Sequence, residues 1–167
     1  MTTEQRLDRL EAIDEIRQLK AKYLSACDLK AIDDIRACFA EGEIHIDYGM
    51  LGIHKHRDAL VGLFDQLGNH PHILDSHHGQ NGQITINSST SADASWQLHF
   101  QQINTKESTV TQLMGFYADK YQKIDGQWLI VSTVFTVKST QVHQIKDGNI
   151  EVVFSGGQMP MPPVKEG

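Results

Sequence analysis

The sequence lacks the features that mark membrane, secreted or nucleic-acid-binding proteins. No apolar run approaches the roughly 20 residues that a membrane span requires. The N-terminal stretch alternates charged and apolar residues and has no apolar core of a signal peptide. A formal net charge of −6 without a basic run disfavours binding to phosphate backbones. We therefore expect a cytoplasmic protein that binds neither nucleic acid nor membranes.

Cysteine and recognisable cofactor motifs are also scarce. The two cysteines, Cys27 and Cys38, form no C-x-x-C pair and are expected as reduced residues in helices. The chain has no glycine-rich phosphate loop, G-x-S-x-G or H-E-x-x-H motif. Histidine pairs at 54 and 56, 70 and 72, and 77 and 78 could supply metal ligands, but the carboxylates have no ligand spacing. The sequence predicts neither a metal nor a cofactor.

What is present is the pattern of one α+β domain, for which 167 residues are sufficient. Apolar residues at helical spacing, with a capping box from Thr2 to Gln5, predict a helix over 3–27. Two shorter helices are expected over 31–39 and 57–68, on either side of a small hairpin formed by 44–49 and 52–56. Four strands of an antiparallel meander should follow at 83–87, 93–103, 109–124 and 126–139.

Three helices against one face of a curved sheet would enclose a cone, whose mouth suits a small-molecule pocket. Residues 1–140 should form this domain. Residues 141–167 form a C-terminal extension that is part of the same domain or a loose strap, with a proline- and glycine-rich end.

Few polar residues border the predicted apolar stripe of the first helix. Asp28 is one of them, and a buried carboxylate needs a partner such as an imidazole, which can donate from one nitrogen and keep the other as a base. The alternative is that Asp28 caps the next short helix. Tyr23 lies on the same stripe, either as a hydrogen-bonding group of the pocket or as an ordinary core aromatic.

The residues themselves leave the choice of histidine open. Strict alternation through Ile84 and Ile86 places His78 on their face and His77 on the other. Gly79 and Gly82 lie in between, and glycines inside a strand often mark a bulge that switches faces.

The stretches "IRQLKAKYLSACD", "HHGQNGQITI" and "FYADKYQKIDGQW" resemble the SnoaL-like branch of the NTF2-like superfamily. The likeness runs from about Ile13 to Lys138. It is greatest to the bile acid 7α-dehydratases, and scytalone dehydratases belong to the same group. This resemblance implies a cone of curved antiparallel sheet closed by three helices.

The resemblance also implies site residues. The tyrosine and aspartate of the family match Tyr23 and Asp28, and a tyrosine of the following strand matches Tyr48. Its catalytic histidine matches His77 and not His78, which requires a bulge near Gly79 to Gly82.

Two positions depart from the family. Phe100 and Val137 stand where the bile acid enzymes carry an aspartate and an arginine. The pocket should therefore be more apolar and its substrate different. Expected lining residues are Tyr48, Trp96, Leu98, Phe100, Leu113, Phe116, Phe135 and Val137.

The resulting hypothesis is a cofactor-independent lyase of the dehydratase type, or a related proton-transfer enzyme such as an isomerase, acting on a small, largely apolar cyclic substrate. His77 is the expected base, Asp28 holds it, and Tyr23 donates a hydrogen bond. The alternatives are a non-catalytic module that binds a small apolar ligand and a structural partner subunit. A homodimer or homotrimer is expected, because this fold usually buries the outer face of its sheet.

Overall fold

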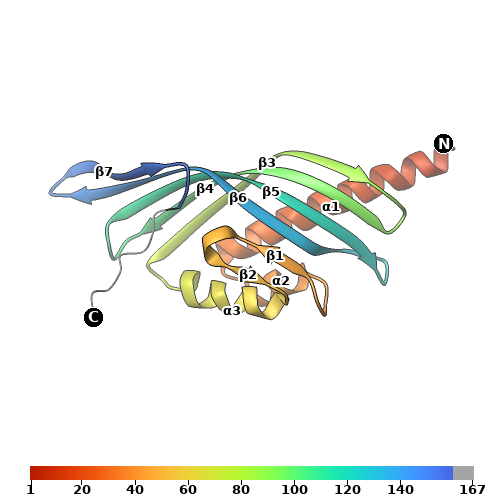
Figure 1. The fold of residues 1–167 in the computed structure, drawn as a ribbon, viewed down its shortest axis with the longest axis horizontal. Coiled ribbons are helices and arrows are strands. Elements are labelled where there is room, and N and C mark those ends of the chain that lie inside the picture. The colour runs from red at the N-terminus through yellow and green to blue at the C-terminus, as the bar shows by residue number, and fades with distance from the viewer. Residues whose placement is uncertain (160–167) are drawn as a thin grey trace.

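A strongly curved sheet dominates the structure, and the helices lie beneath its concave face (Figure 1). The computed structural model describes residues 1–159. Six strands follow the order β2-β1-β6-β5-β4-β3, and β7 pairs with β6 beyond this path. All pairs are antiparallel except β1 with β6. The predicted α+β fold, a curved antiparallel sheet with helices on its concave face, is confirmed, and the sheet does not close on itself.

The strands differ greatly in length, from a minimal hairpin to long twisted ribbons. Their bounds are β1 His45–Asp47, β2 Ile53–His54, β3 Ile73–Ile86, β4 Ser91–Asn104, β5 Thr109–Ile124, β6 Gln127–Lys146 and β7 Asn149–Gly156.

The helices are α1 Thr3–Leu29, α2 Ile32–Ala37 and α3 Arg57–Gly68, with a short 3-10 turn, η1, at Gly49–Leu51. The predicted capping box of α1 is confirmed, because Thr2 and Gln5 bond reciprocally. No helix within residues 1–159 is long and apolar enough to cross a membrane.

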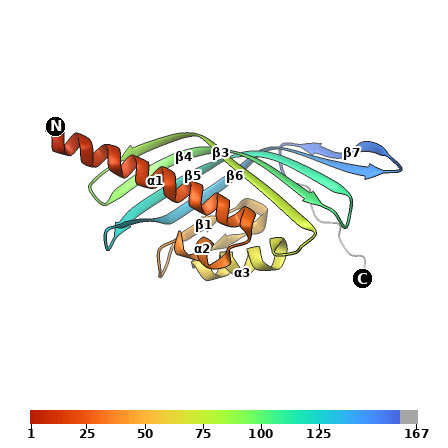
Figure 2. The same ribbon diagram turned by 180° about the vertical axis from the view of Figure 1, so that it is seen from behind.

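Only part of α1 packs on the sheet. Its buried residues begin at Ala12, whereas Leu7 and Leu10 are exposed. The N-terminal turns extend toward one end of the sheet, opposite the β6–β7 hairpin (Figure 2). Leu10 is therefore not part of the core.

Two boundaries differ from those that the sequence predicts. Strand β3 begins at Ile73, ten residues before the expected 83–87, because histidines, glycines and amides obscure its alternation. Strand β6 continues past residue 139 to Lys146 and forms a hairpin with β7, so residues 141–156 belong to the sheet. Most of the proline-rich end, from residue 160, lies outside the described residues.

A fully buried ion pair joins α1 to the sheet. Lys20 Nζ lies 2.8 Å from Asp119 Oδ2, and both side chains are almost completely inaccessible. Tyr121 and Thr133 also donate hydrogen bonds to this carboxylate, at 2.8 and 2.7 Å. The ammonium group lies 3.4 Å from the centroid of the Tyr117 ring. Burial lowers the pKa of Lys20, and the attraction of Asp119 opposes that effect.

Candidate active site

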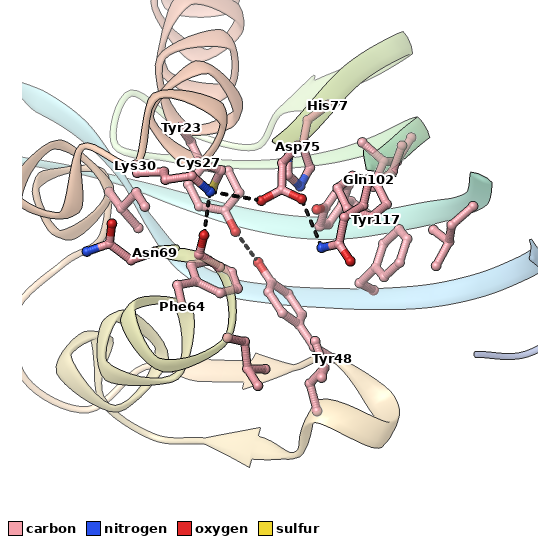
Figure 3. A pocket seen from close by; sticks show the side chains of 18 of the residues that line it. Tyr23, Cys27, Lys30, Tyr48, Phe64, Asn69, Asp75, His77, Gln102 and Tyr117 are labelled. Atoms are coloured by element: carbon pink, nitrogen blue, oxygen red, sulfur yellow. Dashed lines mark hydrogen bonds and ion pairs between the residues drawn. The ribbon is translucent and has the colours of Figure 1, made fainter. Parts of the chain in front are cut away.

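A cavity of about 360 Å³ lies between the concave face of the sheet and the helices (Figure 3). Its wall is mainly apolar and aromatic, with a few polar groups among these side chains. The residues that line it include Tyr23, Cys27, Lys30, Tyr48, Phe64, Asp75, His77, Leu98, Phe100, Gln102, Leu113, Tyr117 and Phe135.

An aspartate from α1 and a histidine from β3 meet at the edge of this cavity. His77 Nδ1 lies 2.5 Å from Asp28 Oδ1. The backbone N–H of His77 donates to both oxygens of the same carboxylate, at 3.1 and 3.0 Å. Because a carboxylate only accepts, Nδ1 must carry the proton, and Nε2 of the neutral ring is then a free acceptor.

The position of Asp28 suits an orienting role. His77 lines the cavity. Asp28 lies behind it on α1, where it contacts the imidazole but does not line the cavity. The helix continues through Leu29, and α2 starts after Ala31 without a side-chain cap. Asp28 therefore does not cap α2, and its carboxylate fixes the position and tautomer of the imidazole.

A bulge in β3 decides which histidine faces inward. The register of β3 on β4 shifts between Gln80 and Gln83, where the sequence predicts a bulge. Before it, Asp75 and His77 face the cavity; after it, Ile84 packs on the core. His78 lies outside and bonds Ser76 Oγ at 3.0 Å.

Glycines at and next to this bulge allow close packing. A Cβ atom on Gly79 would lie 2.7 Å from Leu24 Cδ1 of α1. A Cβ atom on Gly82 would lie 2.2 Å from the Trp96 ring. The absence of side chains at these positions lets α1 and Trp96 pack directly on β3.

Two tyrosine hydroxyls form a second polar feature of the cavity. Tyr23 of α1 and Tyr48, which precedes η1, are both buried, and their oxygens lie 2.7 Å apart. Burial raises the pKa of each phenol, so both remain protonated. Two hydroxyls carry two protons and share one in their mutual bond, which leaves one O–H able to donate to a ligand.

Aromatic rings surround this tyrosine pair. Tyr48 stacks on Phe64 with ring centroids 6.3 Å apart and makes edge contacts with Tyr117 and Phe135. Phe100 lies against the His77 ring, with centroids 4.5 Å apart. The His77 ring and the hydroxyl pair are therefore set in a largely apolar cavity.

Three residues predicted to line the pocket do not line it. Trp96 is buried against Gly82 of β3 and donates to Tyr121 Oη at 3.1 Å. Phe116 alternates with the inward-facing Tyr117 and is exposed on the outer face. Val137 packs on the core, but Phe135 occupies the space over Gly115 on the cavity side.

Several lining residues were not identified from the sequence. Tyr117 is four residues from Leu113 on β5, so strict alternation would have found it. Lys30, Asp75 and Gln102 come together from the end of α1 and from paired positions of β3 and β4. No local pattern indicates a cluster that depends on strand register.

Within residues 1–159, no three histidine, cysteine, aspartate or glutamate side chains are arranged to hold a metal ion. The histidine pairs noted in the sequence have other contacts. His54 bonds Leu51 O, His56 bonds Gly42 O, and His70 stacks on His72.

The comparisons with known proteins agree with this architecture. The model of the SnoaL-like domain family matches residues 8–134, so the chain belongs to that family.

Solved structures share the fold. A protein from Novosphingobium aromaticivorans that carries a provisional assignment as a scytalone dehydratase is 25% identical, with a TM-score of 0.73 over 80% of this chain and 88% of that one. The hexachlorocyclohexane dehydrochlorinase LinA-type3 from Novosphingobium barchaimii is 14% identical, with a TM-score of 0.71 over 93% and 99% of the two chains. An NTF2-like protein with a cystatin-like fold, from N. aromaticivorans, is 17% identical, with a TM-score of 0.68 over 80% and 86%.

Proposed function

We propose that this protein is a cofactor-independent lyase that eliminates a leaving group from a small, largely apolar cyclic substrate. One observation carries the proposal: within residues 1–159, the Asp28–His77 pair leaves Nε2 of an oriented imidazole unbonded at the edge of a largely apolar cavity. A histidine so held is suited to general-base catalysis near neutral pH.

In the proposed reaction, Nε2 of His77 accepts a proton from a substrate carbon next to an activating group. The electrons of the broken C–H bond form a carbon–carbon double bond, and the leaving group departs with its bonding electrons. Asp28 stabilises the imidazolium that forms. The free O–H of the Tyr23–Tyr48 pair donates to the substrate oxygen on which negative charge develops.

The apolar wall strengthens both contributions. Hydrogen bonds and charge interactions are stronger where water is excluded. Phe64, Phe100 and Phe135 supply this environment around the base and the hydroxyls. The named neighbours also favour the proposal, because dehydratases and dehydrochlorinases are both elimination enzymes.

A ligand-binding role without chemistry is the alternative that the same pocket supports. Because the natural substrate is not identified, the decisive probe is an activated carbon acid. In 5-nitrobenzisoxazole, removal of one C–H proton breaks the N–O bond and releases a coloured phenolate, so a positioned base is detected directly.

We expect the wild-type protein to accelerate this reaction and His77→Ala to lose roughly 10²–10⁴-fold in kcat/KM. His78→Ala is the matched control, since that histidine faces outward, and should stay within about twofold of wild type. Equal rates for His77→Ala and wild type would rule out His77 as the base. Saturable binding without acceleration by the wild-type protein would support the binding module.

A further inference from the structure

A third polar feature lies in the same cavity and has no part in the proposed proton transfer. Lys30 Nζ lies 3.6 Å from Asp75 Oδ2, and Gln102 Nε2 donates to Asp75 Oδ1 at 2.9 Å. Lys30 also donates to the carbonyl oxygen of Gly68 at the end of α3. Figure 3 shows these side chains converging at the cavity from three different elements.

Lys30 has a backbone conformation that is unusual for a residue with a side chain. Lys30 is the C-terminal cap of α1 and has φ 57°, in the left-handed region that glycine adopts most easily. A residue with a long charged side chain occupies this position at a conformational cost. The contacts of the ammonium group offset that cost.

Those contacts leave hydrogen-bonding capacity unused. A separation of 3.6 Å between Nζ and Oδ2 is too long for a direct hydrogen bond. Among the described residues, the hydrogen bonds of this cluster use one Lys30 N–H and one Asp75 oxygen. A donor and an acceptor are therefore adjacent, and one oxygen atom about 2.8 Å from each would complete both bonds.

The balance of charge selects the kind of group that fits. Lys30 and Asp75 neutralise each other, while Asp28 adds a second carboxylate near His77. The Lys30 and Asp75 side chains are only 22% and 10% exposed, so solvent screens them incompletely. An anionic ligand would meet this excess of negative charge, whereas a neutral hydroxyl both accepts from Lys30 and donates to Asp75.

We propose that Lys30 and Asp75 form a hydroxyl-binding subsite that selects neutral, hydroxylated cyclic substrates and excludes carboxylates. This inference deepens the proposed function and rests on it for the identity of the reacting end. Asp75 and His77 are two residues apart on the same face of β3, about 7 Å along the strand. A two-ring carbon skeleton can thus present its hydroxyl to Lys30 while a ring carbon lies at His77.

Three probes with one ring system test the subsite: 2-naphthol, naphthalene and 2-naphthoate, each titrated into the protein by calorimetry or ligand-detected NMR. We expect 2-naphthol to bind roughly tenfold more tightly than naphthalene, and 2-naphthoate to bind most weakly. This preference should disappear in Lys30→Met and in the charge-balanced Lys30→Met/Asp75→Leu, which should bind 2-naphthol and naphthalene about equally.

Controls separate binding from folding. Lys22→Met makes the same change at an exposed ion pair on the same helix and should keep the preference. Lys30→Gly suits the left-handed backbone, so it retains the helix cap while it removes the side chain. Naphthol preference that persists in folded Lys30→Met and Lys30→Gly proteins would overturn the subsite, as would tightest binding of 2-naphthoate.

This measurement is independent of the proton transfer. If 2-naphthol binds no more tightly than naphthalene but His77-dependent cleavage of 5-nitrobenzisoxazole is intact, only the subsite proposal is refuted. Loss of the cleavage activity with the preference intact would instead remove the proposed reaction and leave a hydroxyl-selective binding pocket.

Discussion

Helix α1 contributes to two polar pairs that differ in how completely their atoms are satisfied. Asp119 accepts from Lys20, Tyr121 and Thr133 in a region that is almost inaccessible. Asp28 accepts from both N–H groups of His77 but leaves the far side of the imidazole open to the cavity.

This difference separates stability from function. The Lys20–Asp119 pair is almost inaccessible to a ligand, and its charges are compensated by each other, by neighbouring hydroxyls and by the face of the Tyr117 ring. The Asp28–His77 pair is partly accessible, and Nε2 of its imidazole has no hydrogen-bond partner among residues 1–159. The candidate site is therefore indicated by an accessible atom without a hydrogen-bond partner, His77 Nε2, and not by the burial of charge alone.

Breaking the buried Lys20–Asp119 pair should have the largest effect on the free energy of unfolding. Lys20→Met leaves the Asp119 charge buried without its cation, and we expect a loss of about 3–5 kcal/mol in the free energy of unfolding. Urea denaturation measures this change. Lys22→Met, at an exposed pair on the same helix, should change stability by less than about 1 kcal/mol. Similar losses in the two variants would contradict the distinction.

Breaking the partly accessible Asp28–His77 pair should instead reduce activity much more than stability. Asp28→Asn removes the charge that holds the His77 tautomer, so cleavage of 5-nitrobenzisoxazole should fall by roughly 10²-fold or more. Stability should change by no more than about 1 kcal/mol, because the Asp28 side chain is partly solvated. Asp34→Asn, on the exposed surface of α2, serves as control. If Asp28→Asn is less stable but its folded fraction cleaves 5-nitrobenzisoxazole at the wild-type rate, the pair has a structural role only.

Local sequence patterns predicted the helices and the β1–β2 hairpin, and they allowed the bulge between Gln80 and Gln83 that the resemblance required. Each of these depends on neighbouring residues: a capping box, an alternating run, or glycines inside a strand. The resemblance to the family, and not periodicity, favoured His77 over His78. The structure shows the physical reason, since the bulge reverses which residues of β3 face inward.

The rest of the site depends on contacts that no local pattern encodes. Lys30 and Asp75 are far apart in sequence, and Gln102 meets Asp75 through the register of β3 on β4. The error at Phe116 was of another kind. Its aromatic character suggested a pocket residue, although its parity relative to Leu113 places it on the outer face.

The smallest expected effect tests whether the cavity beside His77 is dry. Cys27 lines the cavity next to Asp28 in sequence, and burial raises the pKa of its thiol from 9.0 to about 12. Above pH 9 the unfolded chain loses this proton and the native protein keeps it, so the free energy of unfolding falls as pH rises from about 9 to about 12.

The Cys27 contribution is isolated by comparing urea unfolding of wild type and Cys27→Ala at pH 7.5 and at about pH 10. Cys38, whose thiol pKa burial raises to about 11, is present in both proteins and cancels. Wild type should lose about 1 kcal/mol more than Cys27→Ala on going to the higher pH. An equal loss would mean that the thiol ionises normally in the folded protein. Water would then reach the cavity wall, and neither the tyrosine pair nor His77 would act in the dry environment that the proposed elimination requires.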